Sequence, residues 1–169
     1  ATSMSIYKEY IRKYEEKEVE KELIEKIIEA GTWAPSAGNI QDWRFVVVSN
    51  PKIKDQLSMA CYNQEHVRKA PYAIVVCSDL MKAWRAYGKR GVELYSIQDT
   101  AAAIQNMLLQ AFSLGLGTCW IGTFDEKEVG DILKLPSHWR PLAIVTVGYP
   151  KEEPKSWRIP WDRLTLWIE

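Results

Sequence analysis

The sequence has few of the residues on which metal centres and disulfide frameworks depend. Two histidines, His66 and His138, occur among 169 residues. The three cysteines, Cys61, Cys77 and Cys119, are odd in number and scattered. This pattern is typical of reduced thiols in a cytoplasmic protein rather than of a disulfide framework. We therefore expect a cytoplasmic protein without a metal cluster.

Neither sign of charge is in excess, and long apolar runs are missing. The 22 basic and 22 acidic residues are interspersed, so no whole-molecule field attracts nucleic acid or anionic lipid. The apolar stretches "YAIVVC" and "LAIVTV" are much shorter than the roughly 18 residues of a membrane span. The first residues, "ATSMSIYKEY", lack the basic and then apolar regions of an export signal. We expect a soluble protein with a small ligand.

Familiar catalytic motifs are also missing. The sequence contains no Gly-x-Ser-x-Gly, no P-loop, no His-Glu-x-x-His and no Gly-x-Gly-x-x-Gly after a strand. An enzyme of this kind would depend on a bound cofactor for its reactivity, with the protein supplying position, hydrogen bonds and charge.

What the sequence does contain is an alternation of helical and strand-like hydrophobic patterns in one domain, residues 1–169. Pro51 suits the first position of a helix, and Asp125 followed by Glu128 is a capping-box-like start. The expected helices cover residues 20–34, 51–62, 97–114 and 125–135, and the expected strands cover residues 44–50, 72–79, 115–122 and 141–150. The pattern predicts an α+β fold with a mixed, mainly antiparallel central sheet wrapped by helices.

Tryptophan is unusually frequent, and the carboxy-terminal tail differs from the rest. Eight tryptophans occur in the chain, and large aromatic residues fill cores and subunit interfaces. The tail, residues 151–169, is interrupted by proline but ends in the apolar "LTLWI". We expect it to pack on another subunit.

A turn of small and amide-bearing residues, "PSAGNIQ" (35–41), follows the first predicted helix. Its small side chains would let a flat ring approach the backbone, while Ser36, Asn39 and Gln41 offer donors and acceptors. The same residue types also make ordinary helix-to-strand loops. Composition alone leaves both interpretations open.

Three blocks, in this order, resemble the FMN-dependent nitroreductase family over nearly the whole chain. They are "YIRKYEEKEVEKELIEKIIEAGTWAPSAGNIQDWRFVVV", "DTAAAIQNMLLQAFSLGLGTCWIGTFDEKEV" and "RPLAIVTVGYPKEEP". The resemblance implies the nitroreductase fold and a homodimer with FMN at the subunit interface, the tail extending onto the partner. It also implies NADH or NADPH as electron donor.

The resemblance further implies which residues bind FMN. Lys8, Tyr10 and Arg12 match the phosphate-binding element, although Glu9 replaces its middle basic residue. In the tail, Arg158 matches a second phosphate contact, with Lys155 as the alternative. The residues matched to the flavin ring are Pro35, Ser36, Ala37, Asn39 and Gln41 in the turn, Asn63 and His66 at its pyrimidine, with Gln64 competing with His66, and Ile121 and Gly122 at N5. Asp42 stands where the family often has proline.

The function that follows is FMN-dependent NAD(P)H oxidation by a ping-pong sequence. Hydride passes through flavin N5 to an electron-poor acceptor, such as a nitroaromatic or a quinone, and no side chain acts as a base. The acceptor pocket is expected in residues 82–95, where Trp84, Arg85 and Tyr87 either stack on the ring or cover it. The alternative is a non-catalytic flavin-binding or sensing protein of the same fold.

Overall fold

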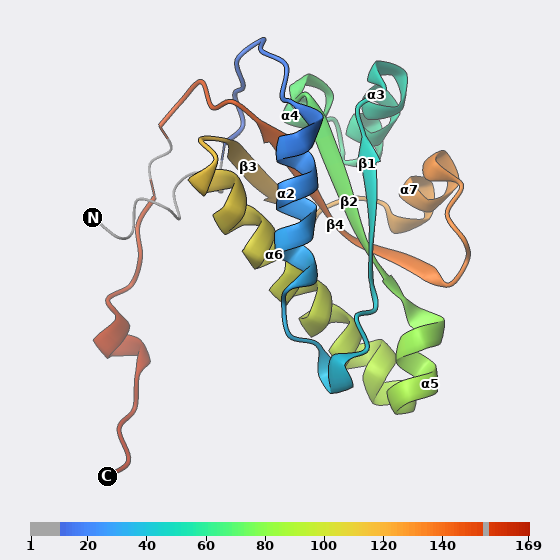
Figure 1. Ribbon diagram of the computed structural model, residues 1–169, viewed down its shortest axis with the longest axis vertical. Helices are drawn as coiled ribbons and strands as arrows, with labels where there is room; N and C mark the ends of the chain where they lie inside the picture. Colours follow the sequence, from blue (N-terminus) through green and yellow to red (C-terminus); the bar gives the residue numbers. More distant parts are fainter. Residues whose placement is uncertain (1–10, 154–155) are drawn as a thin grey trace.

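A single four-stranded sheet organises the computed structural model, which describes residues 11–153 and 156–169. The strands are β1 (Trp43–Val48), β2 (Tyr72–Asp79), β3 (Gly117–Ile121) and β4 (Trp139–Gly148). They lie in the order β1-β2-β4-β3, and each neighbouring pair is antiparallel (Figure 1). The prediction of an α+β fold with a mainly antiparallel sheet is confirmed.

Helices surround this sheet, and two of them begin where the sequence predicts, at Pro51 and after Asp125. Asn50 Oδ1 accepts the N–H groups of Lys52 and Ile53, and Asp125 Oδ1 accepts that of Glu128, which satisfies donors that have no intrahelical partner. The helices are α2 (Lys21–Thr32), α3 (Pro51–Ala60), α4 (Glu65–Lys69), α5 (Leu80–Arg90), α6 (Ser96–Ser113) and α7 (Glu126–Leu133). Short turns of other helix types are η1 (Ala37–Asn39), η2 (Gly91–Tyr95) and η3 (Trp161–Leu164). None of the helices described is long and apolar enough to cross a membrane.

The sheet is buried on both faces, as the apolar run of β2 predicts. Ile74 and Val76 belong to a core cluster with residues of α2 and α6. Val75 and Cys77, which alternate with them, belong to a second cluster with residues of α3, α4 and α7. Full burial of a side chain such as Ile74 contributes roughly 1.5–3 kcal/mol, so the two layers stabilise β2 as the central element.

Helix α2 is fixed closely on α6, and this contact determines where the following turn lies. A Cβ on Gly31 would lie 3.0 Å from Met107 Cγ, so the two helices approach where a side chain is absent. Asn106 Nδ2 also donates to the carbonyl oxygen of Ala30 at 3.1 Å. The last turn of α2 is therefore fixed on α6 at Ala30 and Gly31. This contact also fixes the position from which the turn at residues 35–41 begins.

The carboxy-terminal tail exposes most of its apolar side chains. Trp157, Leu166 and Trp167 are 76%, 84% and 70% exposed. In Figure 1 the tail extends away from the sheet and its helices. Because so much contiguous apolar surface is unusual for a single chain, this tail has the character of an interface segment.

Candidate functional site

The predicted cofactor residues fall into two groups. The first group consists of Arg12, Asn63, His66, Ile121 and Gly122. The second is the turn that contains Pro35, Ser36, Ala37, Asn39 and Gln41. In the view of Figure 1 the turn lies beyond the lower end of α2, whereas α4, which carries His66, lies at the height of its upper end. Lys8, Tyr10 and Lys155 lie outside the described residues, and Arg158 lies on the exposed tail.

Two members of the first group border a cavity of about 800 Å³. Two predicted residues from distant parts of the sequence, Arg12 and His66, meet there. The wall is formed by Arg12, Lys13, Tyr14, Glu15, Glu16, Glu65, His66, Lys69 and Lys151. Four of these side chains are basic, so the cavity, called the basic cavity below, suits an anionic ligand despite its three glutamates.

Arg12 is held at this cavity by its backbone and by β3. Its N–H donates to Glu152 Oε1 at 2.8 Å, and the neighbouring Ile11 N–H donates to the Thr118 carbonyl oxygen at 3.0 Å. The guanidinium group is also close enough to the Cys119 thiol to influence its ionisation. Burial raises the pKa of that thiol, while the charge of Arg12 and its hydrogen bond act in the opposite direction. Arg12 is therefore positioned before any ligand binds.

His66 carries an unsatisfied polar atom in the wall of the basic cavity. The residue is only 6% exposed, and its Nε2 is buried without a hydrogen-bond partner among the described residues. Burial, and then the nearby charge of Arg12, lowers the pKa of His66, so the ring is neutral at neutral pH. Buried polar atoms are nearly always hydrogen-bonded in proteins, which indicates that a ligand or solvent completes this site.

The residues before His66 form a strained turn that presents Asn63. Tyr62 and Asn63 have φ angles of 56° and 61°, in the left-handed region that few non-glycine residues occupy. Gln64, the predicted competitor of His66, donates its amide to the carbonyl oxygens of Cys61 and Thr123 at 3.0 and 3.2 Å. Gln64 thus ties the loop after β3 to this turn, and that role engages its amide N–H groups.

Ile121 and Gly122 lie at the end of β3 in different environments. The Ile121 side chain is buried in the core, so only its backbone can face a ligand. Gly122 is exposed, and no atom of the described residues lies within 4 Å of the position a Cβ would take. Open space beside a glycine backbone is compatible with the close approach of a flat ring.

The second group forms a tight turn with unusual backbone conformations. Gly38, Asn39 and Gln41 have φ angles of 54°, 56° and 51°. Ser36 Oγ accepts the Gln41 N–H at 3.0 Å, and Asp99 Oδ1 accepts the Ala37 N–H at 3.0 Å. A cavity of about 330 Å³, called the turn cavity below, lies beside it and is lined by Ala37, Gly38, Tyr87, Tyr95, Gln98 and Asp99. Such strain is characteristic of binding turns.

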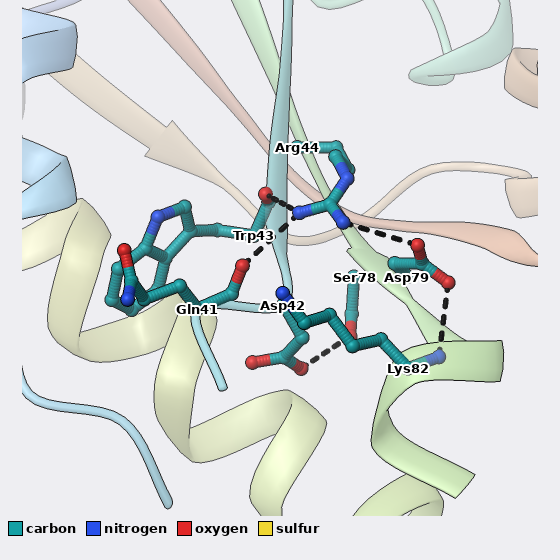
Figure 2. A network of polar contacts seen from close by, with 7 residues as sticks. All are labelled: Gln41, Asp42, Trp43, Arg44, Ser78, Asp79 and Lys82. Atoms are coloured by element: carbon teal, nitrogen blue, oxygen red, sulfur yellow. Dashed lines mark hydrogen bonds and ion pairs between the residues drawn. The ribbon is translucent and has the colours of Figure 1, made fainter. Parts of the chain in front are cut away.

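A polar network anchors this turn to the sheet (Figure 2). Asp42 is fully buried, and its Oδ2 accepts the Ser78 hydroxyl at 2.6 Å. Arg44 donates to the Gln41 carbonyl oxygen at 3.1 Å and forms an ion pair with Asp79, also at 3.1 Å. The end of β2 and the start of β1 therefore hold the turn through several polar contacts.

Sequence reasoning missed several side chains that line the two cavities. Lys13 follows Arg12 directly, and Lys69 lies three residues after His66 on α4, so helical spacing was a usable signal for Lys69. Lys151 reaches the basic cavity because its N–H donates to the Lys13 carbonyl oxygen at 2.9 Å. Asp99 lies in the predicted central helix, but its contact with Ala37 depends on tertiary structure.

Comparison with known proteins agrees with this architecture. The family model described as "Nitroreductase family" matches residues 9–64 and 54–149. A NADH dehydrogenase of Thermus thermophilus is 32% identical over 195 residues, covering 99% of this chain and 95% of that protein. A FMN reductase (NADPH) of Bacillus subtilis is 30% identical over 153 residues, covering 83% of this chain and 61% of that protein.

Solved structures extend the similarity to the fold. The NfrA1 nitroreductase of B. subtilis superposes with a TM-score of 0.87 at 27% identity, over 98% of this chain and 72% of that one. Nitroreductase A of Vibrio parahaemolyticus gives a TM-score of 0.88 at 26% identity, over 99% of this chain and 75% of that one. The prediction of an oxidoreductase is confirmed, and the chain belongs to the nitroreductase family.

Proposed function

We propose that the protein is an FMN-dependent NAD(P)H oxidoreductase whose basic cavity holds the FMN phosphate and the polar edge of the flavin. The observation that carries this proposal is the meeting of Arg12 with His66, whose Nε2 is buried and unsatisfied among the described residues. Guanidinium and ammonium groups bind phosphate. A neutral imidazole nitrogen is suited to hydrogen bonding with a pyrimidine edge.

Each predicted residue has a role in this proposal. Lys8, Tyr10, Arg12 and Arg158 bind the phosphate, assisted by Lys13, Lys69 and Lys151. Asn63 and His66 face the flavin pyrimidine, and the backbone of Ile121 and Gly122 faces N5. The turn formed by Pro35, Ser36, Ala37, Asn39 and Gln41 lines the ring. The strained backbone at Asn39 and Asn63 supports the assignment of both segments to binding.

The separation of the two groups supports a homodimer with shared sites. Helix α2 has 12 residues and therefore spans about 18 Å. The turn lies beyond one end of it and α4 near the other (Figure 1). The two groups of a single chain therefore lie towards opposite ends of α2, which favours a site shared between two chains. A second copy, whose turn approaches the basic cavity of the first, would complete the site, and the exposed tail supplies apolar surface for that contact.

The chemistry is supplied by the cofactor and the positioning by the chain. Bound FMN would take hydride from NADH or NADPH and pass it to an electron-poor acceptor, a nitroaromatic or a quinone, in a ping-pong sequence. Arg12 and His66 would supply positive charge and a hydrogen bond, because negative charge that develops during a reaction is stabilised by preorganised donors. No side chain is required as a general base.

Anaerobic mixing of the FMN-loaded protein with NADH or NADPH tests the proposal. Rapid loss of flavin absorbance, followed by its return when a quinone or nitroaromatic is added, is the expected result. Flavin that stays oxidised with both donors would refute the oxidoreductase assignment for this site. FMN free in solution at the same concentration provides the baseline rate.

A further inference from the structure

Two buried carboxyl groups, those of Asp42 and Asp99, lie behind the turn. Asp42 is fully buried and Asp99 is 5% exposed. Asp42 uses Oδ2 for the Ser78 hydroxyl, and Asp99 uses Oδ1 for the Ala37 N–H. The remaining oxygens, Asp42 Oδ1 and Asp99 Oδ2, are both buried and have no donor among the described residues. The side chains of Asp42 and Asp99 are nevertheless close enough to influence each other.

Two ionised carboxylates cannot satisfy this arrangement, because both oxygens are acceptors and their charges repel in a poorly solvated environment. A single proton between Asp42 and Asp99 removes the repulsion and satisfies both oxygens. Burial, followed by the hydrogen bond to Asp42, raises the pKa of Asp99 to about 7. The pair therefore retains a proton at pH values where a solvated aspartate has lost it.

We propose that Asp42 and Asp99 share one proton and act together as positioning residues that hold the 35–41 turn in its ligand-binding conformation. Asp99, on α6, accepts the N–H of Ala37 in the turn, and Asp42, which follows the turn, accepts the hydroxyl of Ser78 near the end of β2. The shared proton joins these two anchors. The link to ligand binding rests on the proposed function, in which this turn lines the flavin.

The neighbouring charged groups do not replace this proton. Arg44 is engaged by Asp79 and by two backbone carbonyl oxygens, and the Asp79 carboxylate also caps α5 through the Lys82 N–H at 3.2 Å. On the cavity side the titratable groups are Tyr87 and Tyr95, with Arg90 donating to the Tyr95 hydroxyl at 3.0 Å. Among the described residues, therefore, no cation is bound to the two unsatisfied oxygens.

The direction of the pH effect follows from the raised pKa. The folded protein binds the shared proton more tightly than the unfolded chain does, so the proton stabilises the folded state most below the ordinary aspartate pKa. That stabilisation declines as the pH rises and is lost at about pH 7, where the pair ionises. Above this value the two anchors repel, and the turn is no longer tied to α6 through Asp42.

The proton itself is tested in the flavin-free protein by urea unfolding between pH 5.5 and pH 8. The pair should contribute a fall of the unfolding midpoint as the pH rises to about 7, after which this contribution levels off; the opposite contribution of His66 below pH 6.5 is common to all the variants compared. Asp42→Asn, whose amide can donate to Asp99 while its oxygen accepts from Ser78, should remove this fall. Asp99→Asn should do the same from the other side. The control is Asp125→Asn, which alters an exposed carboxylate that also accepts one backbone N–H, and it should keep the wild-type pH dependence.

A wild-type infrared spectrum adds a measurement that needs no variant. The carbonyl band of a protonated carboxyl group should be present at pH 6 and absent at pH 8.5. Absence of this band at pH 6, or an unchanged pH dependence of unfolding in Asp42→Asn or Asp99→Asn, would overturn the shared proton.

The positioning role is tested by FMN affinity at pH 6.5 and pH 8.5. One linked proton changes a dissociation constant by up to about tenfold per pH unit. Between pH 6.5 and pH 8.5, the ratio of the wild-type FMN dissociation constant to that of Asp42→Asn should therefore rise at least about fivefold. The ratio cancels the titration of FMN itself. Equal pH profiles would refute the positioning role and leave the FMN assignment intact. Absence of FMN binding at every pH would instead refute the proposed function, and with it the role in flavin binding, while the unfolding experiment would still decide on the shared proton.

Discussion

Replacing Gly38 by alanine should disturb the turn in two separable ways. Gly38 has a φ of +54°, and a Cβ there would lie 2.2 Å from the Tyr87 hydroxyl oxygen, 3.2 Å from its Cζ and 3.3 Å from its Cε2. The left-handed conformation costs an alanine about 1–2 kcal/mol. The contact in addition forces the Tyr87 side chain to move.

The cost of moving Tyr87 is bounded by the contact that it loses. Its ring packs edge-to-face on Tyr95, with centroids 5.1 Å apart and an interplanar angle of 83°. Such an aromatic pair contributes about 0.5–1.5 kcal/mol beyond its buried area. Gly38→Ala should therefore lower the free energy of unfolding by about 1.5–3.5 kcal/mol.

A matched control separates the two contributions. Gly115 also has a positive φ, +79°, but no atom of the described residues lies within 4 Å of its would-be Cβ. Gly115→Ala should therefore show only the conformational cost, about 1–2 kcal/mol. Urea unfolding followed by tryptophan fluorescence measures both variants, and adding Tyr87→Phe to Gly38→Ala should recover most of the difference between them.

Two results would refute this reasoning. If Gly38→Ala is as stable as Gly115→Ala, the Tyr87 contact has no energetic weight. If Tyr87→Phe does not improve the Gly38→Ala protein, the hydroxyl group is not the obstacle. Either result would mean that Tyr87 does not pack over the turn in solution.

Four further predictions concern the basic cavity and the tail. Arg12→Ala should weaken FMN binding about 10–150-fold, because a hydrogen bond to a charged group contributes about 1.5–3 kcal/mol. Fluorescence titration with FMN measures this loss. The control is Arg140→Ala, whose guanidinium is bound to Glu126 and which should change the affinity little. Arg12→Ala should also raise the pKa of His66, because the charge of Arg12 lowers it. An NMR titration of the histidine signals measures this pKa. An unchanged titration midpoint of the His66 signal would contradict the prediction. Because the folded pKa of His66 is depressed, its contribution to stability is present above about pH 6.5 and is lost as the pH falls through the folded value, so His66→Gln should lose less stability than the wild type on acidification below pH 6.5. Deleting residues 156–169 should convert the proposed dimer to single chains in sedimentation velocity and reduce FMN retention, whereas a dimer that persists without them would show that the tail is dispensable.

Local sequence signals predicted most of the fold. The spacing of Ile24 and Ile27 specified α2, the run from Tyr72 specified β2, and Pro51 and Asp125 specified two helix starts. These features depend on neighbours in the chain, so a periodic pattern or a capping residue is enough to reveal them.

The candidate site was less predictable because it depends on contacts between distant segments. The resemblance to nitroreductases supplied Arg12 and His66, which the structure brings to one cavity, but the burial of His66 Nε2 became visible only in three dimensions. Asp42 was noticed only as a departure from the usual proline, and nothing local to it predicted contact with Asp99. Its partner is defined by how α6 packs behind the turn.

Sedimentation velocity detected at the visible absorption band of flavin tests the central claim most directly. The purified protein is incubated with FMN and dialysed before the run. The account predicts that the flavin colour sediments with a particle of two chains, with one FMN for each chain. A colourless boundary with the mass of one chain, and flavin that remains unsedimented, would contradict it.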